Sequence, residues 1–382
     1  MNRSVVASSP PAAGPSVERH SCVLLIAAGI LLPSFFLAAD ARADDLAIFN
    51  WADYFAPDTI AAYEAETGTR VTLDHYDSNE VLETKLLVGG SGYDVVFPAA
   101  SNAERAFRAG ALLPIDPTRL SNYANLDPDI LAALDVVPGG RALGVPYTWG
   151  TVGIAYNPAL VAGRIGDQPM DTLDVLFDPA IANRLADCGI AMIDSPAEVI
   201  AIALNYLGAA PYSDDPADLE RAGALLSAVA PSVRYFSNQK ATGDLAAGAI
   251  CVALVYSGDA AIAQARAIEA GNGVEVRYAI PREGTLMWID LMAIPADSAR
   301  VDAAYRFIDY MLRPEVIAGV TNAVFFANAN LAAAAHVDPA ILEDPGLYPP
   351  KAVRDRLFPD RSLEAGPLRN RTRLWTRIKA GT

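Results

Sequence analysis

Cysteine and histidine are scarce in this chain, with three of each among 382 residues. His-based triads and zinc sites depend on these side chains, so little material exists for either. The sequence also lacks a G-x-S-x-G elbow, a G-x-G-x-x-G loop and a Walker loop, because Gly90-Ser91-Gly92 has neither a third glycine nor a lysine. A pair of carboxylates of the glycosidase type is not excluded, because spacing alone does not rule it out in an acidic chain. We expect a protein that is not an enzyme, with no catalytic residue, metal or other cofactor.

Basic residues are also few, with 29 Lys and Arg against 45 Asp and Glu and a formal net charge of −16. Such an excess of carboxylates repels phosphate backbones and attracts small cations. We therefore expect no nucleic-acid partner, and the charge favours a cationic ligand. The hydrophobic fraction of 52% is too high for a disordered chain and sufficient for one or two cores.

The N-terminus has the pattern of a cleaved secretory signal peptide. Arg3 and Arg19 precede an apolar run at residues 22–32, which is shorter than the ~20 residues of a membrane-spanning helix and is followed by Pro33. The small-x-small triplet at residues 41–43 predicts cleavage after Ala43. No cysteine stands directly after the cleavage site, so a lipid anchor is not expected.

Removal of the leader leaves two cysteines, Cys188 and Cys251, in an exported chain. Because the compartment outside the cytoplasm is oxidising, we expect one disulfide between them. Two separate buried thiols are the alternative. A metal site is less favoured, because neither His75 nor His336 lies beside a cysteine.

The mature chain alternates between apolar strand-like runs and helical segments. Strands are expected at residues 46–49, 71–76, 93–98, 152–156, 190–193, 250–256 and 288–294, and helices at 57–68, 79–90 and 217–228, with Asn79 as a cap. Such alternation predicts an α/β fold with a parallel sheet flanked by helices. No Ser/Gly linker divides the chain, so two lobes would be interwoven rather than consecutive.

Aromatic residues lie next to carboxylates at three expected strand ends: Trp51 with Asp53 and Tyr54, Tyr256 with Asp259, and Trp288 with Asp290. A ring face and a carboxylate are the two groups that hold an ammonium ion. The pattern therefore indicates an amine-binding site. The alternative is that the rings are core residues and the aspartates are solvated loop charges.

Several motifs in the mature chain together resemble the periplasmic polyamine-binding proteins of ABC importers, and the putrescine-type members most of all. They are Leu46-Ala47-Ile48-Phe49-Asn50-Trp51-Ala52-Asp53-Tyr54, Asp77-Ser78-Asn79-Glu80-Val81-Leu82-Glu83, Tyr93-Asp94-Val95-Val96-Phe97-Pro98, Val145-Pro146-Tyr147-Thr148-Trp149-Gly150-Thr151, Phe325-Phe326-Ala327-Asn328-Ala329-Asn330 and Arg371-x-Arg373-x-Trp375-Thr376.

The resemblance implies a two-lobed periplasmic-binding-protein fold of type II, with the ligand in the cleft between lobes. We expect lobe 1 to comprise residues 44–148 and 288–333, and lobe 2 residues 149–287 and 334–382. The resemblance also implies the disulfide inferred above.

By position, the resemblance assigns ligand-binding roles to ten residues: Trp51, Asp53 and Tyr54 at one end, Glu198, Asp259 and Asp290 as carboxylates, Tyr256, Trp288 and Phe326 along the methylene chain, and Ser101 in place of lost hydroxyls. Ala52 and Ala99 stand where putrescine-type members often carry serine, and Tyr256 and Phe326 where they carry Trp and Tyr. Trp288 is the spermidine-type residue at its position. We therefore expect spermidine to bind at least as tightly as putrescine.

The function that the resemblance implies is capture of a polyamine in the periplasm, as a monomer, and delivery to the membrane permease of an ABC transporter. Two alternatives remain. The same liganded protein would serve as a polyamine sensor if its partner were a signalling protein, and an exported amine-acting enzyme would need a nucleophile, metal or cofactor that the sequence does not show.

Overall fold

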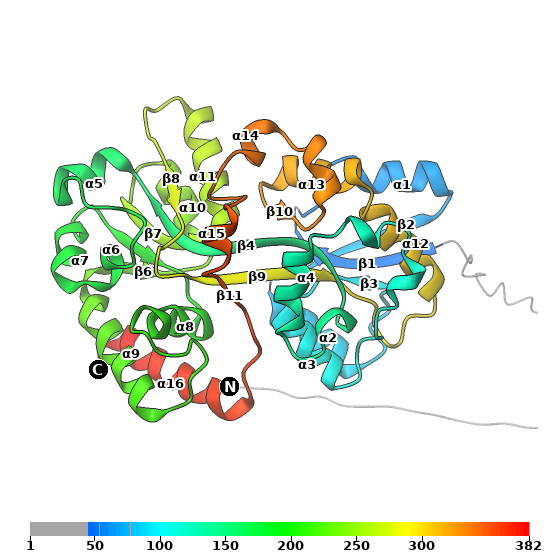
Figure 1. The fold of residues 1–382 in the computed structure, drawn as a ribbon, viewed down its shortest axis with the longest axis horizontal. Helices are drawn as coiled ribbons and strands as arrows, with labels where there is room; N and C mark the ends of the chain where they lie inside the picture. The colour runs from blue at the N-terminus through cyan, green and yellow to red at the C-terminus, as the bar shows by residue number, and fades with distance from the viewer. Residues whose placement is uncertain (1–44, 53, 77, 382) are drawn as a thin grey trace, which may run out of the picture. The chain divides into compact units, whose positions relative to one another are not determined.

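A computed structural model describes residues 45–52, 54–76 and 78–381 of the chain. The predicted signal peptide and Asp53 lie outside the described residues. The described chain contains two sheets and sixteen α-helices (Figure 1). None of its helices is long and apolar enough to cross a membrane.

The smaller sheet has three parallel strands in the order β2-β1-β3: β1 (Asp45–Trp51), β2 (Arg70–Tyr76) and β3 (Val95–Val96). Helices α1 (Thr59–Thr67) and α2 (Asn79–Val88) connect them. Gly68 ends α1 with a φ of 71°, a conformation that glycine adopts without steric cost. The cap of α2 is Ser78, whose side chain accepts from the Val81 N–H, so the predicted cap at Asn79 was wrong by one residue.

The larger sheet has the order β11-β9-β4-β7-β5-β6, and β8 and β10 also pair with β4. Its strands are β4 (Val145–Tyr156), β5 (Ile190–Met192), β6 (Val233–Phe236), β7 (Val252–Tyr256), β8 (Arg277–Ala279), β9 (Leu286–Met292), β10 (Ala327–Asn328) and β11 (Phe358–Pro359). The four strands predicted in this sheet correspond to β4, β5, β7 and β9, although β4 begins seven residues earlier than predicted, and β6, β8, β10 and β11 were not predicted. The sheet is mixed, not parallel. Strand β4 runs antiparallel to β7, β8, β9 and β10, whereas β5 is parallel to both of its neighbours.

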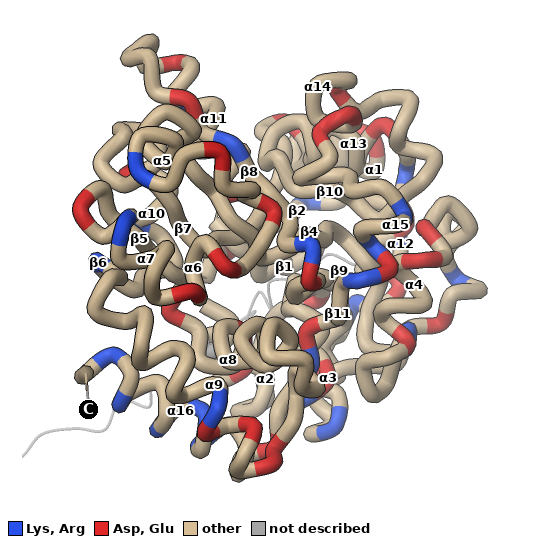
Figure 2. The backbone as a smooth tube through the Cα atoms, turned by 60° about the vertical axis from the view of Figure 1, so that its left-hand side comes forward, with Lys and Arg blue, Asp and Glu red and all other residues tan. Residues whose placement is uncertain are grey.

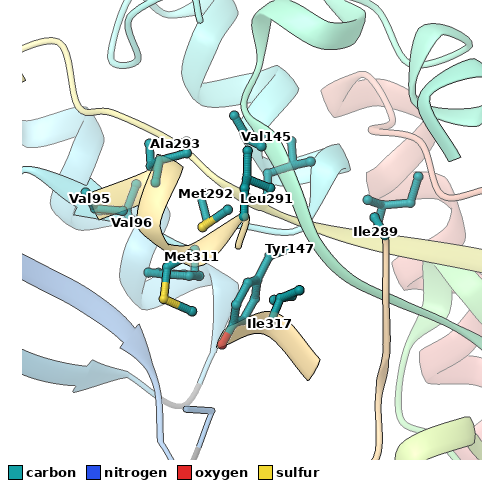
Figure 3. Close-up of a cluster of buried hydrophobic side chains, with 14 of the residues drawn as sticks. Val95, Val96, Val145, Tyr147, Ile289, Leu291, Met292, Ala293, Met311 and Ile317 are labelled. Atoms are coloured by element: carbon teal, nitrogen blue, oxygen red, sulfur yellow. The ribbon is translucent and has the colours of Figure 1, made fainter. Parts of the chain in front are cut away.

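Two long strands join two hydrophobic cores. In β4, Val145, Tyr147 and Trp149 pack in the first core, and Val152 and Ile154 pack in the second. Its antiparallel neighbour β9 likewise contributes to both cores, and Figure 1 shows the two strands side by side across the middle of the fold. Figure 3 shows how closely the side chains of β4 and β9 pack with those of β3, α12 and α13 in the first core.

The first core is assembled from residues 46–149 and 287–347, and the second mainly from residues 152–288 and the C-terminal helix. The exact boundaries stay a prediction, and the packing of Val337, Ile341 and Leu347 in the first core favours a return to lobe 2 later than residue 334.

The remaining helices surround these sheets, and α16 packs against α8 and α9. They are α3 (Ala100–Arg108), α4 (Pro128–Asp135), α5 (Pro158–Ile165), α6 (Asp174–Phe177), α7 (Pro179–Leu185), α8 (Pro196–Tyr206), α9 (Pro216–Val229), α10 (Lys240–Ala246), α11 (Ser257–Ala270), α12 (Val301–Met311), α13 (Pro314–Val324), α14 (Pro339–Leu342), α15 (Lys351–Arg354) and α16 (Ala365–Ala380).

The structure contains the predicted disulfide between Cys188 and Cys251, with 5.5 Å between their Cα atoms. The two cysteines precede the adjacent parallel strands β5 and β7, in which Ile190 is paired with Val252. The bond therefore joins the entrances of two neighbouring strands in the second core.

Candidate functional site

Tyr54 and Asp290 form the first part of the candidate site, in the region of the first core. The Tyr54 hydroxyl donates to the Asp290 carboxylate at 2.7 Å and lies 2.5 Å from the Thr148 hydroxyl oxygen. Tyr54 follows β1, Thr148 lies in β4 and Asp290 in β9, so three segments distant in sequence meet at this point. Both Tyr54 and Asp290 are buried.

Tyr256 and Glu198 form the second part, on the second core. Tyr256 is the last residue of β7, and its hydroxyl donates to the Glu198 carboxylate at 2.7 Å. Glu198 lies in the first turn of α8 and Asp259 in the first turn of α11, which begins directly after β7. The carboxylates therefore stand at helix N-termini, where the helix dipole favours negative charge.

Aromatic rings connect the two parts. The Trp288 ring lies 5.1 Å from Phe326 and 6.4 Å from Tyr256 between centroids, both edge to face, and Phe326 lies 5.9 Å from Tyr54. Gly258 is required beside these rings, because a Cβ there would overlap Phe326. Gly150 has the same role beside Trp288.

Burial governs the electrostatics of the carboxylates. It raises the pKa of Asp290 to about 7, with the charge of Asp360 adding to the shift and the Tyr54 hydrogen bond opposing it. Burial likewise raises the pKa of Asp259 to about 6, against the charge of Arg266. The pKa of Glu198 is also raised, by burial and then by the charge of Asp360.

Within the described residues, no lysine or arginine forms an ion pair with Glu198, Asp259 or Asp290. The structure therefore holds three carboxyls whose pKa is raised by burial and with which no lysine or arginine pairs directly, although the charge of Arg266 acts on Asp259. Across the described chain, no group of three or more His, Cys, Asp or Glu side chains could hold a metal ion. Carboxylates in this state bind an external organic cation favourably, because it restores the missing counter-charge.

Nine of the ten predicted residues lie in or next to the two parts of the site described above. The tenth, Asp53, is not described. Trp51 ends β1 and packs on Tyr76 at 4.6 Å between ring centroids, and its indole N–H donates to the Phe97 carbonyl. The charge of Asp290 contributes to the raised pKa of Tyr76, so Trp51 lies near the same carboxylate. Ser101 lies in the first turn of α3, and its hydroxyl opposes the upward pKa shift of Asp360. As ligand-binding residues, all ten remain predictions.

Sequence reasoning missed Asp360. It follows the two-residue strand β11, and its backbone N–H donates to the Met287 carbonyl at 2.8 Å. Its pKa is raised, first by burial and with a contribution from the charge of Glu104, against hydrogen bonds from Ser101 and the Arg361 N–H and the charge of Arg105. Phe358, in β11, lies two positions before it, the same spacing as between Trp288 and Asp290, but no strand was predicted at residues 358–359, so the pattern was not recognised there.

The C-terminal helix α16 supports the position of Glu198. Arg371 is completely buried and donates to the carbonyls of Ala197, Pro211 and Ser213. The Trp375 indole N–H donates to Asp194 at 2.7 Å. The closing Arg and Trp of the sequence motif therefore hold the start of α8. Figure 2 shows that basic residues recur along α16, whereas acidic residues are spread over many elements.

Known proteins are similar to this chain in sequence and in fold. Residues 58–349 match the model of the bacterial extracellular solute-binding proteins. The chain is 44% identical to the putrescine-binding periplasmic protein SpuD of Pseudomonas aeruginosa, over 88% of this chain and 92% of that protein. It is 42% identical to the putrescine-binding periplasmic protein PotF of Escherichia coli, over 93% of this chain and 97% of that protein.

Among solved structures, the substrate-binding protein PotD of a spermidine/putrescine ABC transporter from Streptococcus pneumoniae has a TM-score of 0.77 at 27% identity, covering 88% of this chain and 99% of that chain. These similarities confirm the resemblance found in the sequence and the two-lobed type II fold. The chain belongs to the family of bacterial extracellular solute-binding proteins.

Proposed function

We propose that this protein binds a polyamine in the periplasm, by closure of its two lobes around the ligand, and delivers it to the membrane permease of an ABC transporter. The observation that carries the proposal is the set of desolvated carboxylates at Glu198, Asp259 and Asp290, joined by the rings of Tyr256, Trp288 and Phe326. Relatives named for putrescine binding, over nearly their whole length, support the same ligand class.

The chemistry of the site matches a protonated amine. Each ammonium end donates charge-assisted hydrogen bonds to a carboxylate, and the methylene chain packs against ring faces, which also attract the cation by ~0.5–2 kcal/mol per contact. Two anchored ends and a covered alkyl chain are compatible with a micromolar dissociation constant, about −8 kcal/mol. No chemical step is part of this function, and the ligand leaves unchanged.

Isothermal titration calorimetry of the purified mature protein tests the proposal. The ligands are putrescine, cadaverine, agmatine, spermidine and spermine, with glutarate as a dianion of similar length. We expect at least one amine to bind with a dissociation constant of about 1 μM or lower and to be recovered unchanged, and glutarate not to bind. Absence of binding by all five amines would contradict the proposal, and conversion of an amine to product would favour the enzyme alternative.

A further inference from the structure

The charge of helix α16 is opposite in sign to that of the chain as a whole (Figure 2). The helix contains four arginines and one lysine and no aspartate or glutamate, in a protein with 45 acidic and 29 basic residues. Two of these five cations stabilise the fold, because Arg371 is buried and donates to backbone carbonyls and Lys379 pairs with Asp194 at 2.9 Å. The other three cations are exposed: Arg369, Arg373 and Arg377.

These three residues form a row on the surface of α16, which we call the arginine stripe. They are spaced at four positions and therefore share one face of the helix, over about 12 Å of its length. Among the described residues, no carboxylate forms an ion pair with any of them. Like charges at this spacing repel one another, so the stripe destabilises the helix. The helix dipole favours Arg377 in the last turn, but it does not account for Arg369 and Arg373.

The exposed positions between the arginines are polar and uncharged. They are Asn370, Thr372 and Thr376, and the hydroxyls of both threonines donate to carbonyls of the same helix at 2.9 Å. Trp375 and Ile378 are buried, and none of the large exposed apolar side chains of the described chain lies in α16. A protein partner usually requires an apolar centre in its interface, and this face does not provide one.

The chemistry of the stripe matches phosphate groups. A guanidinium group is always charged and pairs with a phosphate through two parallel hydrogen bonds. The headgroups of anionic phospholipids present many phosphates on one surface, and they move laterally, so they adapt to the spacing of the arginines. Basic residues next to such a surface are attracted to it without any apolar contact.

The surroundings of the stripe limit this attraction to one face. The net charge of −16 opposes the approach of the protein to an anionic surface, but charges farther away than about 8 Å are largely screened at physiological ionic strength. Asp214 and Glu220 line a groove between α9 and α16 together with Arg373 and Arg377. Both acidic residues belong to the α9 side of that groove, so they border the stripe and do not interrupt it along α16.

We propose that the arginine stripe docks the protein reversibly on the anionic phospholipid headgroups of a membrane. The inference goes beyond the proposed function, because the stripe lies on the exposed face of α16 and the start of α8, next to Glu198, is held by the buried face. For a protein that delivers its ligand to a membrane permease, attachment would confine the search for the permease to the membrane surface. The attachment is electrostatic, so added salt releases the protein.

Vesicle sedimentation with the mature protein tests the proposal. The vesicles consist of phosphatidylcholine alone or with about half phosphatidylglycerol, and each is used at about 20 mM and about 500 mM NaCl, where the Debye length differs several-fold. The test variant is Arg369→Gln with Arg373→Gln and Arg377→Gln. The matched control is Arg141→Gln with Arg277→Gln and Arg306→Gln, three exposed arginines from separate parts of the chain, so that both variants change the net charge equally.

We expect wild type to sediment with the phosphatidylglycerol vesicles at low salt only. The test variant is expected to lower the partition coefficient about tenfold or more, and the control to lower it less than about threefold. Thermal unfolding checks that each variant is folded. The assay uses no amine, so its outcome is independent of the proposed ligand.

Three outcomes would overturn the proposal. The first is that wild type does not bind phosphatidylglycerol vesicles, or binds phosphatidylcholine equally well. The second is an equal loss in both variants, which would show an effect of net charge and not of the stripe. The third concerns fluorescently labelled polyglutamate, an acidic polypeptide used as a second probe at low salt. If wild type binds polyglutamate and not the vesicles, the stripe fits an acidic protein partner instead of a lipid surface.

Discussion

Burial affects the pKa of Asp259 more than the positive charge of Arg266 does. Arg266 lowers its pKa, yet the net shift is upward, to about 6. We expect Asp259→Asn to abolish high-affinity amine binding, with a loss of ~3–5 kcal/mol if the ion pair is desolvated, because the amide keeps the shape and removes the charge. Calorimetry with putrescine and spermidine measures the loss.

Glu269→Gln is the matched control for Asp259→Asn, since Glu269 is exposed near the end of the same helix. Its affinity is expected to equal that of wild type, and both variants are expected to unfold near the wild-type temperature. Wild-type binding by Asp259→Asn would show that Asp259 is a solvated charge outside the site.

Trp288 is the residue for which ring size bears on ligand choice. Its ring lies edge to face against both Tyr256 and Phe326, so the variant Trp288→Phe keeps an aromatic contact and reduces the π surface. We expect Trp288→Phe to shift the ratio of the spermidine and putrescine affinities toward putrescine by ~0.5–2 kcal/mol, the range of one cation–π contact. Titration of both proteins with both amines measures the ratio, and an unchanged ratio would assign selectivity to other residues.

At the residue scale, the sequence predicted side chains whose chemistry is visible locally. Asp259 and Asp290 each lie within three positions of an aromatic residue at a strand end, and this spacing made them candidates. Asp360 follows Phe358 within the same spacing, but the two-residue strand β11 was not predicted from the sequence. The charge of Asp360 contributes to the raised pKa of Glu198, which lies 162 positions earlier in the chain, and an interaction over this sequence distance could not be predicted from local patterns.

At the scale of elements, the disulfide joins the entrances of β5 and β7 across 63 positions of sequence. A cross-link that closes a loop of this length restricts the unfolded chain, and the entropic model gives about 3–5 kcal/mol. We expect Cys188→Ala with Cys251→Ala to lower the free energy of unfolding by about that amount, measured by urea denaturation. Because neither sulfur belongs to the candidate site, amine affinity should change little.

Thiol counting in the denatured, non-reduced mature protein is the direct check on the bond itself. We expect no titratable thiol before reduction and two after it. Two free thiols before reduction would contradict the disulfide.

The positions of several strands and helices could be predicted from local sequence patterns, whereas the relative directions of the strands could not. The β1-α1-β2 unit was predicted because its apolar runs, caps and Gly68 lie close together in sequence. Strand β4 was predicted only at residues 152–156, and its antiparallel pairing was missed. Its partners β7 and β9 begin 96 and 130 residues after β4 ends, so their direction depends on the path of the chain between them.

At the scale of the whole molecule, the buried carboxyls link stability to pH. The pKa values of Asp259 and Asp290 are raised from 3.8 to about 6 and about 7, so between pH 4 and pH 7 the folded state binds more protons than the unfolded state. Their stabilising contribution is complete below about pH 4 and is lost as the pH rises through the folded values.

We therefore expect Asp290→Asn to gain stability relative to wild type as the pH rises from 4.5 to 8, by ~1–3 kcal/mol. Thermal unfolding of the amine-free proteins across this range measures the difference, and a bound amine should diminish it by supplying the counter-charge. Parallel pH profiles of the two proteins would contradict the raised pKa of Asp290.

The interleaving of the two cores also bears on the order in which a growing chain can fold. The first core includes residues up to 347, so it cannot be completed until nine-tenths of the polypeptide has been made. The second core waits for Trp375 and Ile378 at the extreme C-terminus. A nascent chain with this topology cannot close either core early, and a chain without closed cores is suited to threading through a narrow translocation channel.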